Sequence, residues 1–234
     1  TLDGNLVLEI SLNSERSLNA LTLEMIQLIE PRLTAAASDH RVKAIVLTSA
    51  GEKAFCAGGD VVGLYKYITA GDQPDFPEQY FTSEYRLDYL IHTHPKPIIC
   101  WGSGIVMGGG MGLMNGCSHR IVTQTSHLAM PEVTIGLYPD VGGSFFLNRM
   151  PGRTGLFLGL TGNPIYAADA LFLGLADRFI DANKFDVMMT RLLANDWSGD
   201  ANILVTKMLR ELEHESVESF RADSPIQDHY EFIQ

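Results

Sequence analysis

Cysteine and positive charge are both scarce in this chain. Its 234 residues contain three cysteines, Cys56, Cys100 and Cys117, without any CxxC spacing. An odd number of cysteines in apolar or glycine-rich surroundings gives no disulfide framework, so we expect a reducing compartment. The 17 lysines and arginines stand against 28 aspartates and glutamates, which gives a formal net charge of −11. Because binding to phosphates draws on an excess of basic side chains, no nucleic-acid partner is expected.

Charge is absent altogether from Pro97 to Ser118, a stretch long enough to span a bilayer. Its seven glycines and Asn115 would make a poor lipid-facing helix, whereas a buried strand, a turn and a helix account for the same residues. We therefore expect no membrane association. The apolar content of 46% is enough for a sizeable core, and no internal repeat is evident, so we expect one domain with a trailing segment.

Strand and helix signals alternate along the chain, which indicates an α/β fold. Strands are expected near residues 6–10, 44–48, 98–101, 119–123, 128 and 176–180. Helices are expected near residues 22–37, 61–69, 78–91, 108–117, 142–150, 155–160 and 167–173. After Asp181 the pattern is helical.

Two glycine-rich turns each follow a strand-like run and precede a helix. They are AFCAGGD at Ala54 to Asp60 and the triplet of Gly108, Gly109 and Gly110. At such a junction unpaired backbone N–H groups point outward, with no side chain to cover them. Two of these groups aimed at one carbonyl oxygen would form an oxyanion hole. Glu132 follows closely enough for its carboxylate to return to the same pocket, so the pattern suggests acyl chemistry.

Glu84 occupies an unusual place in the helix expected at 78–91. Helical spacing puts it on one stripe with Tyr80, Leu87 and Ile91, an otherwise apolar face. An isolated glutamate in a helix usually lies at the edge of such a stripe, where it reaches solvent or pairs with an arginine. From spacing alone we favour that interpretation.

Other motifs are weaker. Residues 102–107 nearly form a GxGxxG dinucleotide fingerprint, but methionine replaces the last glycine and no ribose-binding acid follows. His92 and His94 lack a supporting third ligand, so no metal site is expected. Cys56 has no histidine near it in the sequence, and we expect it to serve in packing rather than as a nucleophile.

Three ordered motifs together resemble the crotonase, or enoyl-CoA hydratase/isomerase, superfamily. They are AFCAGGD at Ala54 to Asp60, GIVMGGGMGL at Gly104 to Leu113 and MPEVTIGLYPDVGG at Met130 to Gly143. Each glycine turn alone is common, but the ordered combination is highly specific. The similarity runs from about residue 5 to residue 180. The segment from Phe81 to Gly110 is most similar to the 3-hydroxyisobutyryl-CoA hydrolase branch.

The resemblance implies a spiral of ββα units, with residues 1–181 as a crotonase-like core and 182–234 as a helical C-terminal segment. The branch has a longer C-terminal portion, so we expect 182–234 to be incomplete. The implied partner is a small-molecule acyl-CoA, whose CoA is part of the substrate, so no separate cofactor is expected. Association into a homo-oligomer is left open. The expected location is the cytoplasm for a bacterial protein and the mitochondrial matrix for a eukaryotic one.

Motif alignment with the superfamily assigns roles to five residues, and all five are expected to bind substrate. The oxyanion-hole amides fall on Gly59 and Gly109. A catalytic carboxylate falls on Glu132, and an additional acid of the hydrolase branch falls on Asp140. Glu84 matches a glutamate that contacts the hydroxyl group of the substrate, which gives a carboxylate on an apolar stripe a reason to be there.

The acids leave more than one mechanism open. Glu132 or Asp140 could orient and deprotonate a water molecule, or attack the thioester to give an anhydride that water then opens. Two close carboxylates would raise the pKa of one, which could then act as an acid toward the leaving thiolate. Asp140 could also cap a helix at Val141, alone or in addition.

Gly112 narrows the choice of reaction. It stands two residues past the glycine triplet, where the hydratases of the superfamily carry a second glutamate. Hydration of a double bond is therefore disfavoured, and the resemblance implies hydrolysis of an acyl-CoA thioester, with 3-hydroxyisobutyryl-CoA of valine catabolism as the expected substrate. The alternatives are another crotonase-type enzyme, such as an enoyl-CoA isomerase, and a catalytically silent acyl-CoA binding protein.

Overall fold

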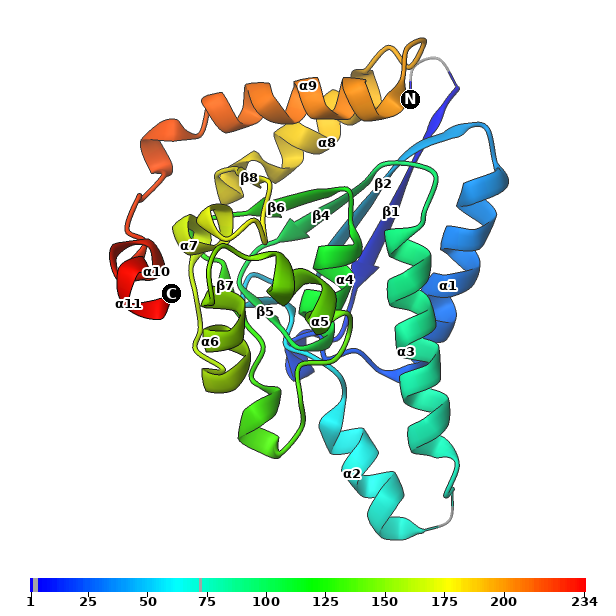
Figure 1. Ribbon diagram of the computed structural model, residues 1–234. Helices are drawn as coiled ribbons and strands as arrows, with labels where there is room; N and C mark the ends of the chain where they lie inside the picture. The colour runs from blue at the N-terminus through cyan, green and yellow to red at the C-terminus, as the bar shows by residue number, and fades with distance from the viewer. Residues whose placement is uncertain (2–3, 72) are drawn as a thin grey trace.

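The computed structural model describes residues 1, 4–71 and 73–234. Figure 1 shows that strands and helices alternate along most of the chain. The strands are β1 (Leu6–Leu12), β2 (Val42–Ser49), β3 (Ala54–Cys56), β4 (Ile98–Gly102), β5 (Ile105–Met107), β6 (His119–Val122), β7 (His127–Ala129) and β8 (Arg178–Phe179). The helices are α1 (Leu23–Ser38), α2 (Val61–Ala70), α3 (Phe76–His92), α4 (Gly109–Gly116), α5 (Gly143–Phe146), α6 (Thr154–Thr161), α7 (Ala167–Phe172), α8 (Phe185–Ala194), α9 (Ala201–His214), α10 (Pro225–Asp228) and α11 (Tyr230–Ile233). A 3-10 turn, η2 (Glu132–Ile135), follows β7.

The strands divide between two parallel sheets. Strands β1, β2, β4, β6 and β8 lie in this order in the larger sheet, and β3, β5 and β7 form the smaller one. Strands β2, β4 and β6 of the larger sheet are followed in the chain by β3, β5 and β7 of the smaller sheet, respectively. After each of these short strands the chain returns to the larger sheet. The chain therefore alternates between the sheets in ββα-like units, as the resemblance implies.

Several boundaries differ from those predicted. The expected strand at 176–180 is reduced to β8, and the helix expected at 142–150 divides into α5 and a 3-10 turn at Leu147–Arg149. Helix α3 begins at Phe76, two residues before the expected start. Strands β3 and β5 were not predicted from periodicity, because three residues are too few to show an alternation.

Both faces of the larger sheet are buried. Ile45 and Leu47 of β2 belong to the apolar cluster that includes residues of α1 and α3. Ala44 and Val46, which alternate with them, belong to the cluster formed with α8 and α9. Figure 1 shows these two pairs of helices on opposite sides of the sheet. Such two-sided cover explains why residues 44–47 of this strand are all apolar rather than alternating with polar residues.

Two helices begin at residues whose side chains cap the helix N-terminus. The Thr22 hydroxyl accepts a hydrogen bond from the Met25 N–H at 3.2 Å, and the Asp60 carboxylate accepts one from the Gly63 N–H at 2.9 Å. Pro31 lies inside α1, which nevertheless continues to Ser38. The first cap fixes α1 against the larger sheet, and the second fixes the start of α2.

The charge-free stretch at 97–118 folds into β4, β5 and α4, as the buried strand-and-helix interpretation predicts. In the part of the chain that the structure describes, none of the helices is both long and apolar enough to cross a bilayer.

Candidate active site

The smaller sheet brings the sequence motifs together at one edge. Strands β3 and β5 pair in parallel with Cys56 opposite Val106, and β5 and β7 pair with Met107 opposite Ala129. In a parallel sheet the carboxyl ends of the strands lie at the same edge, where ligands of α/β proteins usually bind. The first glycine turn follows β3, the second follows β5 and Glu132 follows β7. Segments more than 70 residues apart in sequence therefore meet here.

The two glycine turns contact each other through their backbones. A Cβ placed on Gly109 would lie 3.2 Å from the nitrogen of Gly59, and a Cβ on Gly58 would lie 3.4 Å from the Met107 carbonyl oxygen. Gly58 has a φ of 115° and Gly108 a φ of 48°, which L side chains rarely adopt. Glycine is therefore required here both for backbone conformation and for close approach.

Two backbone donors remain unpaired where the turns meet. Among the described residues, neither the N–H of Gly59 nor that of Gly109 has a hydrogen-bond acceptor. Gly109 is the first residue of α4, so its N–H has no acceptor within the helix. The two neighbouring backbone groups are both paired with Leu21. The Leu21 N–H donates to the Gly58 carbonyl oxygen, and the Asp60 N–H donates to the Leu21 carbonyl oxygen. These two hydrogen bonds fix the turn and leave the N–H of Gly59 without an acceptor among the described residues.

All five residues that the resemblance assigns line one cavity of about 430 Å³. Gly59 and Gly109 share this lining with the carboxyl groups of Glu84, Glu132 and Asp140. The rest of the lining is mostly apolar and comes largely from α2, from Phe81 of α3 and from the segment after η2. It includes Val61, Leu64, Tyr65, Ile68, Tyr80, Ile135, Leu137 and Val141.

Glu84 is buried beside the glycine turns, with only 2% of its surface exposed. Its Oε1 lies 2.5 Å from the position of a Cβ on Gly109 and 3.6 Å from that of a Cβ on Gly59. The interpretation from helical spacing, that Glu84 reaches solvent or pairs with an arginine, is wrong, because the whole stripe of α3 faces inward. Burial, and then the charges of Asp140 and Glu132, raise the pKa of Glu84 to about 8.

Glu132 begins η2 and is 7% exposed. Its Oε1 lies 2.9 Å from the position of a Cβ on Gly108, and among the described residues its buried Oε2 has no hydrogen-bond partner. Burial raises the pKa of Glu132 to about 7, and the charge of Asp140 acts in the same direction. A carboxyl group with this pKa is partly ionised at neutral pH, which suits a proton acceptor.

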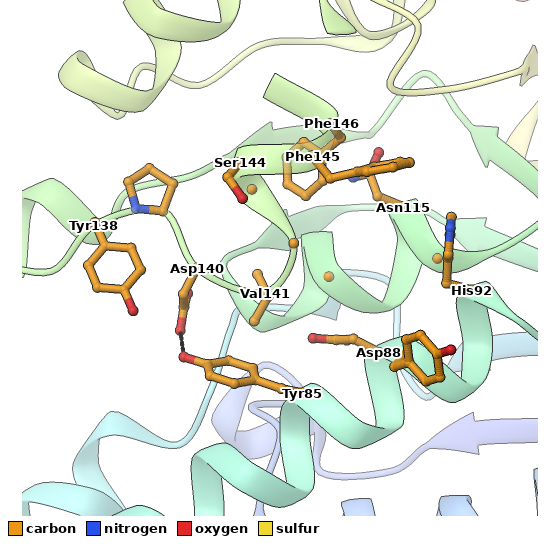
Figure 2. Close-up of a pocket in the computed structure, with 16 residues that line it drawn as sticks. Tyr85, Asp88, His92, Asn115, Tyr138, Asp140, Val141, Ser144, Phe145 and Phe146 are labelled. Carbon is orange, nitrogen blue, oxygen red and sulfur yellow. Dashed lines mark hydrogen bonds between the residues drawn. The ribbon is translucent and has the colours of Figure 1, made fainter. Parts of the chain in front are cut away.

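Asp140 is held by a side chain that the sequence did not single out. Its carboxylate accepts a hydrogen bond of 2.6 Å from the hydroxyl of Tyr85, drawn in Figure 2. The alternative that Asp140 caps a helix at Val141 is wrong, because α5 begins at Gly143 with Gly142 as its N-cap residue. The only sequence signal for Tyr85 is its position next to Glu84, since its partner is 55 residues away.

Tyr80 supports the first glycine turn and was likewise not predicted to do so. Its hydroxyl donates a hydrogen bond of 2.7 Å to the carbonyl oxygen of Leu21, the residue whose backbone holds the turn. The same hydroxyl lies 2.6 Å from the position that a Cβ on Gly59 would occupy. A side chain on Gly59 would therefore displace Tyr80 as well as fill the cavity.

Cys56, His92 and His94, which the sequence did not favour as site residues, pack or hydrogen-bond within the fold. Cys56 is fully buried, and burial raises the pKa of its thiol to about 12, so a thiolate is disfavoured near neutral pH. His94 Nε2 lies 3.1 Å from the Leu33 carbonyl oxygen, whereas the ring of His92 packs edge-on against Phe145. Across the described ranges, no group of three or more His, Cys, Asp or Glu residues could hold a metal ion.

The space next to Gly112 is filled. A Cβ on Gly112 would lie 2.6 Å from the Cβ of Val141 and 2.9 Å from Oδ1 of Asp88. A glutamate at this position would collide with both residues. The structure therefore has neither the second acid at position 112 nor room for it.

Comparisons with known proteins agree with these features. A family model described as enoyl-CoA hydratase/isomerase matches residues 7–234. The mitochondrial 3-hydroxyisobutyryl-CoA hydrolase of Gallus gallus is 43% identical over 185 residues, which are 79% of this chain and 48% of that protein. The small ribosomal subunit protein mS47 of Neurospora crassa is 40% identical over 184 residues, which are 78% of this chain and 36% of that protein. The chain spans about half the length of the curated relatives it matches.

Among solved structures, a carnitinyl-CoA dehydratase from Mycobacterium thermoresistibile superposes with a TM-score of 0.85 at 37% sequence identity. The match covers 97% of this chain and 62% of that one. An enoyl-CoA hydratase from Rhodobacter sphaeroides gives a TM-score of 0.76 at 35% identity, covering 97% of this chain and 75% of that one. The predicted α/β, crotonase-like fold is confirmed.

Proposed function

Because the chain belongs to the enoyl-CoA hydratase/isomerase family, we propose that it hydrolyses an acyl-CoA thioester, converting 3-hydroxyisobutyryl-CoA to 3-hydroxyisobutyrate and CoA in valine catabolism. One observation carries the proposal: a single cavity joins two unpaired backbone donors, on Gly59 and Gly109, to the carboxyl groups of Glu84, Glu132 and Asp140. The Gallus gallus relative named for this hydrolysis supports the substrate. CoA enters as part of the substrate, and no separate cofactor is proposed.

The two glycine N–H groups hold the thioester carbonyl oxygen. When the carbonyl carbon becomes tetrahedral, this oxygen gains negative charge, which donors fixed in a dry cavity stabilise without reorganisation. Loss of one such donor typically costs about 3–4 kcal/mol of transition-state stabilisation. The rigid contact between the two turns is what keeps these donors in place before substrate arrives.

Glu132 supplies the carboxylate for attack, because its Oε2 is buried and unpaired among the described residues. In one route ionised Glu132 takes a proton from water, the water oxygen adds to the carbonyl carbon, and the carbon–sulfur bond breaks. In the other route the carboxylate attacks and forms an anhydride, which water then opens. In the first route Glu132 passes the proton it took from water to the departing CoA sulfur. In the second route CoA leaves as a thiolate, which takes up the proton that the water releases when it opens the anhydride. Label recovered in Glu132 after a single turnover in ¹⁸O-labelled water would identify the anhydride route with water attack at the glutamyl carbon, since direct attack of water on the thioester labels only the product acid.

Glu84 selects for a hydroxylated acyl group. Because its pKa is about 8, its carboxyl group is mostly protonated at neutral pH and can both donate to and accept from a hydroxyl. An acyl group without a hydroxyl removes this hydrogen bond to Glu84, and loss of a partner by a buried polar group typically costs about 1–3 kcal/mol. Glu84 therefore discriminates against acyl groups without a hydroxyl because they lack a hydrogen-bonding group, not because they clash with the cavity wall.

Two other functions are weaker candidates. A catalytically silent acyl-CoA binding protein is suggested by the relative in Neurospora crassa, which is named as a ribosomal protein. An enoyl-CoA isomerase would need one carboxylate, whereas this cavity holds three. The acids around Gly59 and Gly109 favour hydrolysis over both.

A thiol-release assay with 3-hydroxyisobutyryl-CoA tests the proposal. We expect free CoA and a hydroxy acid without a double bond. A product that still carries CoA and has a new double bond would instead identify a dehydratase. Binding of the thioester without any turnover leaves the isomerase and the silent protein, and a parallel assay with an enoyl-CoA separates them, because only the isomerase moves its double bond. The unsubstituted isobutyryl-CoA serves as the matched control substrate and is expected to react more slowly.

A further inference from the structure

A second cavity, of about 450 Å³, lies beside the catalytic cavity, and Asp140 and Val141 line both. Its other walls come from α3, α4 and the segment that runs into α5. Helix α3 serves both cavities, since Glu84 lines the first whereas Tyr85 and Asp88 line the second. The two spaces are therefore neighbours separated by the side chains of two adjacent residues and their contacts.

Val141 stands in this partition with an unusual backbone. Its φ of 41° is rare for any residue with a side chain and is an outlier for a β-branched one, which the surrounding structure must enforce. The side chain is 5% exposed and fills the space next to Gly112. Figure 2 shows Val141 between Asp140, which is bonded to Tyr85, and the carboxyl group of Asp88.

The second cavity suits an apolar chain. Aromatic rings of Tyr89, Tyr138, Phe145 and Phe146 line it. Both oxygens of Asp88 are buried and have no hydrogen-bond partner among the described residues. Burial raises the pKa of Asp88 well above its usual value, which favours the uncharged form of its carboxyl group in this cavity.

We propose that Val141 is a specificity-determining residue: its side chain closes the catalytic cavity toward the second cavity and so restricts the acyl group to a short one. This inference rests on the proposed function, because it places an acyl-CoA in the catalytic cavity. Truncation of Val141 joins the two cavities. Each methylene that then leaves water for the second cavity strengthens binding about fourfold.

Variants Val141→Ala and Val141→Gly test the proposal. Glycine tolerates a φ of 41°, so at least the second variant is expected to fold. The probes are 2-oxoalkyl-CoA thioethers, which keep the carbonyl group but cannot be hydrolysed, from butyryl to dodecanoyl length. Calorimetry gives their affinities, and thiol release from the corresponding thioesters gives turnover. We expect the ratio of long-chain to short-chain affinity to rise about tenfold or more, as two or more methylenes enter.

Two further variants separate the proposed partition from a general loosening of the fold. Val217→Ala removes the same two methyl groups from an exposed valine outside both cavities and is expected to keep the length profile of the unmodified chain. Ser144→Phe, added to Val141→Ala, places a ring in the second cavity and is expected to reverse the gain.

An unchanged length profile in both Val141 variants, with turnover intact, overturns this inference and leaves the hydrolase proposal standing. A long-chain gain that persists after Ser144→Phe also overturns it. Absence of turnover in the unmodified chain and in every variant, together with the expected change in the affinity profile, rejects the hydrolase proposal and keeps the role of Val141 in acyl-chain binding.

Discussion

Two buried glutamates in one cavity reach different protonation states near neutral pH. Glu132, with a pKa of about 7, is partly ionised, whereas Glu84, with a pKa of about 8, mostly keeps its proton. Burial is the main cause in both, and the neighbouring acids add to it. One residue can therefore accept a proton while the other donates a hydrogen bond, although both are the same amino acid.

Substitution Glu132→Gln should lower the turnover of 3-hydroxyisobutyryl-CoA at least about a hundredfold, because the amide keeps the shape of the side chain but can neither accept a proton nor attack. Affinity for the thioester should change little, since Gly59 and Gly109 still hold the carbonyl group. Steady-state kinetics and calorimetry measure the two quantities. Glu211→Gln, on the exposed side of α9, is the matched control, and near-normal turnover of Glu132→Gln would reject the role of Glu132.

Substitution Glu84→Gln should change how stability depends on pH. The pKa of Glu84 is raised from 4.5 to about 8, so between these values the folded protein keeps a proton that the unfolded chain releases. The free energy of unfolding must therefore fall as pH rises across this window, by up to about 5 kcal/mol from this group. Urea unfolding across the window should show a smaller fall for Glu84→Gln. An identical fall in both proteins would mean that Glu84 is not buried as described.

At the scale of elements, three short strands do most of the positioning. The motif residues could be picked out from the sequence, because glycine turns and a proline-flanked acid are local patterns. Strands β3 and β5 could not be predicted from periodicity, since three residues are too few to show an alternation. Their parallel pairing is a long-range property that brings Gly59 next to Gly109. Local sequence patterns therefore identified the motifs of the site but not the fact that they lie close together in the fold.

Long-range contacts also explain the two corrections. Helical spacing placed Glu84 on the correct stripe but could not show that α3 buries this stripe completely. Asp140 precedes a helix, as a capping residue does, yet its partner Tyr85 comes from α3. The resemblance, which carries information about the whole fold, assigned both residues to the site, and both line the cavity; their roles stay predictions.

The start of α2 offers a test at this scale. Asp60 and Asp200 are both N-cap residues, whose carboxylates accept hydrogen bonds of 2.9 Å and 3.0 Å from the Gly63 and Ile203 N–H groups. Replacement of either by alanine should lower the free energy of unfolding by about 1 kcal/mol. Only Asp60→Ala should also weaken acyl-CoA binding, because α2 lines the cavity. Equal effects of both variants on binding would contradict this account.

At the scale of the whole molecule, the larger sheet acts as a scaffold and the smaller sheet carries the chemistry. Helices α1 and α3 cover one face of the larger sheet, and α8 and α9 cover the other (Figure 1). The smaller sheet is thus held at a fixed place with its carboxyl edge at the cavity. The division into a core of residues 1–181 and a C-terminal segment stays a prediction, and so does association into a homo-oligomer.

Glu132 and Glu84, which the fold gathers in one cavity, should give a bell-shaped pH profile. The value of kcat/KM for the hydroxylated thioester should rise with pH as Glu132 ionises near a pKa of about 7. It should fall again as Glu84 loses its proton near a pKa of about 8. The apparent values belong to the coupled group rather than to single residues. Glu84→Gln should remove the fall and keep the rise, whereas an unchanged profile would contradict the assignment of Glu84.

The most direct measurement is a crystal structure with the 2-oxoalkyl-CoA analogue of 3-hydroxyisobutyryl-CoA bound. We predict that its carbonyl oxygen lies within about 2.7–3.1 Å of both the Gly59 and Gly109 nitrogens, with the Glu132 carboxylate beside the carbonyl carbon. A carbonyl oxygen that contacts only one of these nitrogens or neither, or a Glu132 carboxylate directed away from the carbon, would contradict the account.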